Sequence, residues 1–205
     1  MAAHQYEVTE SRRIFEGRVA AMRSDQVSMP AGGTSQRDVV ELPGAVGIVA
    51  LDESERVLLV RQYRHPVRRR LWEIPAGLLD STLESPTQAG ERELFEEGGV
   101  RAGQWLTLVD TLTSPGVSDE TIRILLARDL VEVPASERFV GVHEEAEMEI
   151  EWVPLDRAVD LCLVGDLENG ITVAGLLAAR VALTRGLADL RAADAPWQAR
   201  KRPAP

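Results

Sequence analysis

Residues 84–100 constrain the fold of this 205-residue chain more than any other segment of its sequence. They contain five glutamates, no lysine and a single cation, Arg92. In a helical conformation Glu93, Glu96 and Glu97 stand at positions i, i+3 and i+4 and share one face. Like charges at this spacing repel by roughly a few tenths of a kcal/mol for each exposed pair. A divalent cation would turn that repulsion into coordination, and clustered carboxylates suit Mg²⁺ or Mn²⁺.

The elements around this segment predict an α+β fold. Pro86 suits the first turn of the central helix, and the pair at 98–99 suits its end. Strands are predicted at 45–51, 57–64, 71–77, 105–112, 121–127 and 150–153, and further helices at 155–163 and 173–187. The first two strands are joined by a polar turn and predict a hairpin. This order of elements indicates an α+β fold or a mixed-sheet sandwich.

The two ends of the chain predict separate elements. Residues 1–43 predict short antiparallel strands around a glycine turn at 30–33. An element this small has too little core to be stable alone, so it should pack on the main domain or on a partner subunit. The main domain is expected at 44–190, after a Pro-Gly boundary. Residues 191–205, with three prolines, are expected to form a loose tail.

Composition excludes several classes of protein. The net charge of −10 argues against a general nucleic-acid binder, which would carry a basic face. Cys162 is the only cysteine and lies in an apolar stretch, so a buried thiol in a reducing compartment is expected. The apolar run at 173–183 is interrupted by Arg180 and is too short to cross a bilayer. The amino terminus has no secretion signal, and a cytoplasmic location is expected.

The acidic segment resembles the box of the Nudix hydrolases, whose pattern is G-x5-E-x7-R-E-U-x-E-E-x-G-U with U aliphatic. Every position from Glu84 to Val100 fits this pattern. The sequence departs from it at the front, because six residues rather than five separate Gly77 from Glu84. One extra loop residue costs little, so the departure concerns the path of the loop. The resemblance implies a Nudix-like α/β/α sandwich with a mixed sheet.

A wider resemblance points to the ADP-ribose pyrophosphatase subfamily. Residues 61–64 (Arg-Gln-Tyr-Arg) and 71–77 (Leu-Trp-Glu-Ile-Pro-Ala-Gly) are similar to the lead-in of that subfamily. Pro115 stands fifteen residues beyond Val100, where the subfamily carries a proline. Many members exchange their amino-terminal strands between two subunits, so the resemblance implies a homodimer.

The resemblance implies metal-dependent cleavage of a pyrophosphate, giving AMP and ribose 5-phosphate from ADP-ribose. It makes Glu93 and Glu97 the principal metal ligands, Glu96 an additional ligand and the carbonyl of Ala76 another. The cofactor is then Mg²⁺ or Mn²⁺, which neutralises phosphate oxygens and lowers the pKa of bound water. Arg92 cannot bind a cation and is expected to hold a ligand carboxylate in place.

A general base is also needed, and residues 143–147 (His-Glu-Glu-Ala-Glu) resemble the loop that supplies it in these pyrophosphatases. The order of residues points to Glu144, with Glu145 as the competitor. A solvated acidic turn is the alternative for this segment. A base must reach the attacking water within hydrogen-bonding distance.

Residues outside the box are candidates for substrate binding. By resemblance Arg64 holds the phosphate or ribose region, and Arg61 adds positive field near the acidic site. Trp72 and Glu73 are candidates to line the pocket, although Trp72 suits the core equally well. The remaining candidates, in the turn after the box, are Pro115 and Glu120.

Two other functions fit parts of the pattern. One is a broader nucleoside diphosphate sugar or NADH pyrophosphatase. The other is a non-catalytic ADP-ribose sensor, although the three box carboxylates are all present and 205 residues leave no room for a partner domain. The expected partners are therefore a nucleoside diphosphate sugar and a second subunit, with no nucleic acid and no membrane.

Overall fold

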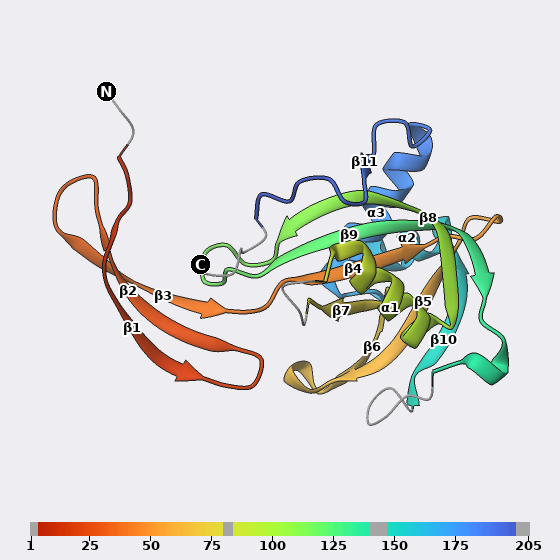
Figure 1. The fold of residues 1–205 in the computed structure, drawn as a ribbon, viewed down its shortest axis with the longest axis horizontal. Helices are drawn as coiled ribbons and strands as arrows, with labels where there is room; N and C mark the ends of the chain where they lie inside the picture. The colour runs from red at the N-terminus through yellow and green to blue at the C-terminus, as the bar shows by residue number, and fades with distance from the viewer. Residues whose placement is uncertain (1–3, 80–83, 140–146, 200–205) are drawn as a thin grey trace.

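A computed structural model describes residues 4–79, 84–139 and 147–199 of the chain. Its centre is a five-stranded mixed sheet (Figure 1). In spatial order the strands are β11 (Arg191–Ala192), β8 (Val100–Leu112), β9 (Thr121–Glu132), β4 (Ala45–Ala50) and β7 (Ala76–Leu78). Strands β4 and β9 are parallel, and the other neighbours are antiparallel. The predicted mixed sheet is confirmed.

A second, three-stranded sheet has the order β10 (Glu149–Pro154), β5 (Arg56–Arg64) and β6 (Arg69–Glu73). The predicted hairpin of residues 45–51 with 57–64 is therefore wrong, because β4 and β5 enter different sheets and share only the bridge between Leu51 and Val57. Strand β4 and the start of β5 are buried on both faces. Such strands need neighbours and cover on each side, whereas a simple hairpin can leave one face in water.

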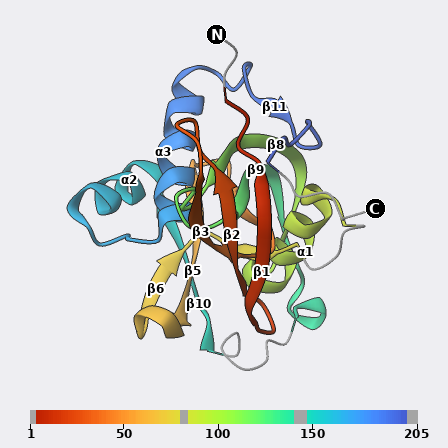
Figure 2. The ribbon, with the colours of Figure 1, turned by 90° about the vertical axis from the view of Figure 1, so that its left-hand side faces the viewer.

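The described residues form three helices, of which the first and third pack on the five-stranded sheet and the second packs on the third helix and on the three-stranded sheet. They are α1 (Pro86–Gly98), α2 (Leu155–Val164) and α3 (Gly170–Thr184), and two 3₁₀ turns lie at His65–Val67 and Ala135–Glu137. Val46 and Ile48 of β4 share one buried cluster with Leu94 of α1, whereas Val49 belongs to another with Leu176 of α3. Alternate residues of β4 thus face opposite helices. Figure 2 shows α1 and α3 on either side of the strands, as the predicted α/β/α sandwich requires.

Helix α1 has the predicted ends. Ser85 and Gln88 form a reciprocal capping box, with Pro86 at the first helical position. Gly99 ends the helix in the left-handed conformation at φ 62°, where glycine has no steric penalty. The carboxylates of this helix are therefore fixed in register from both ends.

The amino-terminal strands β1 (Val8–Glu16), β2 (Ala21–Ser28) and β3 (Thr34–Glu41) form an antiparallel sheet, here called the arm, that projects from the body (Figure 1). All nine residues of β1 are exposed, among them Phe15 with 59% of its surface accessible. The arm is tied to the body through Val40, whose N–H and carbonyl bond Val117 and Asp119 at 2.8 and 3.2 Å.

The sequence predicts a loose tail from residue 191. In the described part of the tail, β11 pairs with β8, and residues 193–196 follow a path bonded to Arg123. Among the helices of the described residues, none is long and apolar enough to cross a membrane.

Candidate active site

The candidate site begins where β7 runs against helix α1. The backbone N–H of Ala76 donates a hydrogen bond of 3.0 Å to Oε2 of Glu97. At the next residue the helix comes so close that a Cβ on Gly77 would lie 1.8 Å from Oε1 of Glu93. Only glycine therefore allows Glu93 to lie in this place. The role of Gly77 is therefore steric, since it allows the close approach of the helix to β7.

Arg92 connects the start of α1 to the strand. Its Nε and Nη2 donate to the two oxygens of Glu84 at 3.2 and 3.3 Å, and its Nη1 donates to Glu93 Oε1 at 2.5 Å. Nη2 also bonds the carbonyl of Leu78 at 3.4 Å, and Glu96 lies 3.6 Å from Nη1. The guanidinium thus orients three glutamates. Hydrogen bonds to Glu84 and the charge of Glu93, acting against burial, raise the pKa of Arg92.

Glu97 is a carboxyl group of the site whose ionised form the protein disfavours. Burial raises its pKa to about 8, and the neighbouring carboxylates Glu93 and Glu73 act in the same direction. The hydrogen bond from Ala76 and the charge of Arg64 oppose this increase without cancelling it. The protein therefore disfavours the ionised form of Glu97, chiefly because burial removes it from water.

This donor set fits a hard divalent cation, since carboxylate oxygens are the ligands that Mg²⁺ and Mn²⁺ prefer. Such an ion would favour the ionised form of Glu97, which burial disfavours. Within the described residues, however, no three acidic, histidine or cysteine side chains converge as a ready metal cage. Glu93 is held by Arg92 and Glu97 by the Ala76 N–H. Each of these two contacts uses one oxygen of its carboxylate.

Arg64 and Glu73 form a bidentate pair, and the charges of both act on Glu97. Arg64 Nε lies 3.0 and 3.1 Å from the two carboxylate oxygens of Glu73, and Nη2 lies 2.6 Å from Oε2. Glu73 is only 1% exposed, whereas Arg64 reaches the surface. Bidentate pairs fix the plane of the guanidinium. Glu73 is thus a buried support for Arg64.

Arg61 and Trp72 are direct partners across β5 and β6. The guanidinium of Arg61 lies 5.9 Å from the centre of the Trp72 ring, and its Nη1 lies 3.3 Å from Glu149. Trp72 is half-buried and packs against the main core cluster. Arg61 and Trp72 thus form a pair that is separate from the Arg64–Glu73 pair.

Pro115 and Glu120 lie in the loop that joins β8 to β9. Glu120 accepts a hydrogen bond of 2.6 Å from the Thr113 hydroxyl, and Pro115 is exposed. This loop shares an end of the sheet with β7, because Ala45 of β4 is the partner of both Leu78 in β7 and Ile122 in β9. The candidates Glu144 and Glu145 lie outside the described residues.

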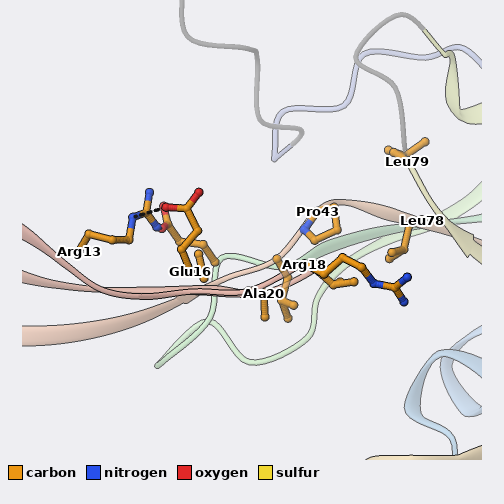
Figure 3. A pocket seen from close by; sticks show the side chains of 12 residues that line it. Arg13, Glu16, Arg18, Ala20, Pro43, Leu78 and Leu79 are labelled. Carbon is orange, nitrogen blue, oxygen red and sulfur yellow. Dashed lines mark hydrogen bonds and ion pairs between the residues drawn. The ribbon is translucent and has the colours of Figure 1, made fainter.

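The arm also borders the site, which the sequence does not indicate. A hollow of about 540 Å³ separates the β1–β2 turn from the end of β7 (Figure 3). Leu78 and Leu79 line it from the body, and Arg18 and Pro43 line it from the arm side. Leu78 is the residue whose carbonyl Arg92 holds. The arm therefore reaches the end of β7, the strand that carries the candidate ligand Ala76.

An α/β/α sandwich with one arginine and three glutamates in this order on α1 defines a Nudix hydrolase. The profile of the NUDIX domain matches residues 41–171, and the chain belongs to this family.

Two relatives are named for the same activity. The chain is 46% identical over 197 residues to an ADP-ribose pyrophosphatase of Mycobacterium tuberculosis, covering 96% of this chain and 93% of the relative. It is 34% identical over 149 residues to an ADP-ribose pyrophosphatase of Bacillus subtilis, covering 73% and 78%. A crystal structure of an ADP compounds hydrolase matches with a TM-score of 0.78 and 21% identity, over 91% of this chain and 98% of that one. At 21% identity this structural similarity supports the assignment of the fold alone.

Proposed function

We propose that this protein hydrolyses the pyrophosphate bond of ADP-ribose to AMP and ribose 5-phosphate. The observation that carries the proposal is the carboxylate helix α1, joined to β7 by the hydrogen bond from Ala76 to Glu97. The substrate is supported by the 46% identity, over nearly the whole chain, to a protein named for that activity.

Glu93, Glu97 and Glu96, with the carbonyl of Ala76, are proposed to hold Mg²⁺ or Mn²⁺. When bound, the cation neutralises the phosphate oxygens and lowers the pKa of a water molecule. Arg92 positions Glu93 through its 2.5 Å hydrogen bond and keeps the Leu78 carbonyl in place. Rigid support of this kind matters because a catalytic group displaced by about 1 Å can lose roughly a hundredfold in rate.

Arg64 is proposed to bind a phosphate oxygen, with Glu73 fixing its orientation. Arg61 and Trp72 are proposed to border the same side of the substrate, and Pro115 and Glu120 its ribose end. A general base must take a proton from the attacking water, and Glu144 is the proposed base, with Glu145 as its competitor.

The protein is further proposed to act as a cytoplasmic homodimer that joins through the arm. The exposed strand β1 supports this assignment, because a free strand edge with Ile14 and Phe15 at the surface is suited to pairing.

The experiment is a substrate panel with Mg²⁺. ADP-ribose, ADP-glucose, GDP-mannose and NADH are compared for release of the nucleoside monophosphate. ADP-ribose should have the highest kcat/KM, and preference for another member of the panel would refute the substrate assignment. Glu97→Gln, if it stays folded, should lose at least about a hundredfold in kcat. A folded wild type that binds ADP-ribose without cleaving any substrate would indicate a sensor.

A further inference from the structure

One buried charge has no part in the proposed chemistry. Arg123 lies on β9 between Ile122 and Ile124 and is 1% exposed. Its side chain is on the same face of the sheet as that of Leu125, next to which Gly90 of α1 packs. A buried guanidinium is costly unless its N–H groups are paired. The partners of Arg123 therefore indicate what its position in the fold serves.

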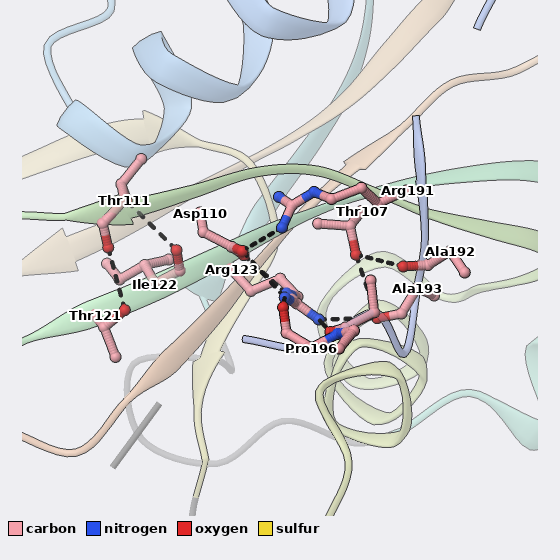
Figure 4. A network of polar contacts seen from close by, with 11 residues as sticks. Thr107, Asp110, Thr111, Thr121, Ile122, Arg123, Arg191, Ala192, Ala193 and Pro196 are labelled. Atoms are coloured by element: carbon pink, nitrogen blue, oxygen red, sulfur yellow. Dashed lines mark hydrogen bonds and ion pairs between the residues drawn. The ribbon is translucent and has the colours of Figure 1, made fainter. Parts of the chain in front are cut away.

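Those partners come from β8 and from the carboxyl-terminal segment (Figure 4). Nε and Nη2 donate to the two oxygens of Asp110 at 2.8 and 3.0 Å. The other bonds go to backbone carbonyls, with Nη1 donating to Ala193 and Ala195 at 3.2 and 2.7 Å and Nη2 donating to Pro196 at 3.4 Å. Within residues 193–196 the guanidinium thus binds the backbone of this segment through its carbonyls.

Residues 191–199, here called the tail strap, are held at two further points. The hydroxyl of Thr107 donates to the carbonyl of Ala192 at 2.8 Å, next to the pairing of β11 with β8. The ring centre of Trp197 lies 5.0 Å from the Arg123 guanidinium, a cation–π contact. The indole N–H of Trp197 is buried and has no hydrogen-bond partner. The strap is thus held by Arg123 and by β8.

The strap lies at the neck of the β8–β9 loop. Asp110 and Arg123 are direct cross-strand partners, and the pairs Thr111–Ile122 and Leu112–Thr121 follow toward the loop. Beyond them Thr113 bonds Glu120 at 2.6 Å. A hollow of about 400 Å³ is lined by the strap residue Trp197 and by Thr111 and Thr121 of the neck. Arg123 therefore holds the strap beside this neck.

The same neck is adjacent to the end of β7, the strand that carries the candidate ligand Ala76. A Cβ on Gly44 would lie 3.2 Å from Leu79 and 3.5 Å from the carbonyl of Thr121. Gly44 also accepts a hydrogen bond of 2.8 Å from the Leu79 N–H. On its other side the β8–β9 loop is bonded to Val40 of the arm. The loop that carries Pro115 and Glu120 is thus braced by the arm and, through its neck, by the strap.

We propose that Arg123 is a positioning residue, which fastens the tail strap against the neck of the β8–β9 loop and so holds Pro115 and Glu120 for the ribose end of the substrate. The proposal rests on the function proposed above. It assigns the strap to substrate binding and leaves the carboxylates of α1 unaffected.

The test compares Arg123→Lys with Arg180→Met. Lysine keeps a charge opposite Asp110 but lacks the planar fork that bonds three carbonyls. Arg180 of α3 lies outside the strap and pairs with Asp156 at 2.9 Å on the surface, so its replacement is the control for the loss of an arginine–aspartate pair. Arg123→Lys should raise KM for ADP-ribose at least about fivefold, with kcat and the Mg²⁺ requirement within about twofold of wild type. Arg180→Met should leave KM within about twofold.

Hydrogen exchange without substrate provides the second readout. Residues 113–120 should exchange faster in Arg123→Lys than in wild type, whereas α1 should be unchanged. A double variant, Asp110→Leu with Arg123→Met, removes both charges and guards against misfolding from one unpaired charge. Unchanged exchange of the loop in the folded variants, or a loss of kcat at unchanged KM, would overturn the proposal. If ADP-ribose is not the substrate, the exchange result still decides whether the strap braces the loop, and KM is measured on the panel's best substrate.

Discussion

The Ala76 N–H and the Glu97 carboxylate, 21 residues apart in the chain, are joined by a hydrogen bond of 3.0 Å that locks β7 to helix α1. One oxygen of Glu97 is thereby fixed while burial and its acidic neighbours oppose its ionisation. This pair links the metal requirement of the site to the stability of the protein.

Replacing Glu97 by glutamine should stabilise the metal-free protein at high pH. The unfolded chain ionises near the ordinary value of 4.5 and the folded protein near 8. Between these values the folded state binds more protons, so stability falls as pH rises through this window. A pKa unit is worth about 1.4 kcal/mol. Because Glu97 keeps some contact with solvent, which screens its charge, we expect Glu97→Gln to gain on the order of 2 kcal/mol at pH 8.

Urea unfolding at pH 4 and pH 8 in EDTA measures this effect. At pH 4 the two proteins should be nearly equal, because the wild-type carboxyl is then protonated. Adding Mg²⁺ at pH 8 should stabilise the wild type more than the variant. An equal gain from Mg²⁺ in both proteins would contradict the assignment of Glu97 as a ligand.

Gly77→Ala should damage activity more than stability. The added Cβ would meet Oε1 of Glu93 at 1.8 Å, and the flexible end of that side chain would move away. We expect a loss of about 1 kcal/mol in the free energy of unfolding and at least about a hundredfold in kcat. Gly170→Ala is the control, because its Cβ would meet no atom within 4 Å. Equal kcat in the two variants would show that the placement of Glu93 is unimportant.

Arg64 and Glu73 should be coupled in stability. Arg64→Met leaves the Glu73 carboxylate buried without its partner, and we expect a loss of about 2–3 kcal/mol. Adding Glu73→Gln should recover most of that stability, whereas activity should remain low because the proposed phosphate contact is gone. Thermal unfolding and steady-state kinetics separate the two effects. Recovery of activity in the double variant would exclude Arg64 from substrate binding.

Phe15→Asp should weaken the proposed dimer. Phe15 is 59% exposed on β1, so a charge there should cost the isolated subunit little. Light scattering after gel filtration should detect a shift toward monomer, with the melting temperature compared at low protein concentration. Val131→Asp, at a residue of β9 with 66% exposure, is the control. An unchanged mass for Phe15→Asp would refute an arm-mediated dimer.

The sequence predicted those parts of the fold in which local chemistry decides the structure. Pro86 and Gly99 predicted the helix limits through backbone preferences, and the spacing of Glu93 and Glu97 predicted one shared helix face, which the structure packs against β7. Strand partners were less predictable. Residues 45–51 and 57–64 read as one hairpin, because periodicity records burial and not which strand provides the cover. The parallel partner of β4 lies more than 70 residues away in the sequence.

The long-range polar pairs in the site also could not be predicted from the sequence. Glu73 was a candidate to line the pocket, and the structure places it in the interior as the support of Arg64. Arg123 gave one signal, a charge within an apolar strand, but its partners at residues 193–196 are 70 or more residues away. The composition of that segment predicted a loose tail, because a side-chain pattern does not reveal carbonyls bound by a distant guanidinium.

The capping of α1 has a consequence for how its sequence can vary. The reciprocal capping box of Ser85 and Gln88 sets the residue at which the helix begins, whatever the length of the loop before it. An insertion ahead of Ser85 therefore alters the loop without rotating any carboxylate around the helix axis. The extra residue between Gly77 and Glu84 is tolerated on these grounds. An insertion between Gln88 and Arg92 would turn each following carboxylate by about 100°, because the helix has 3.6 residues per turn.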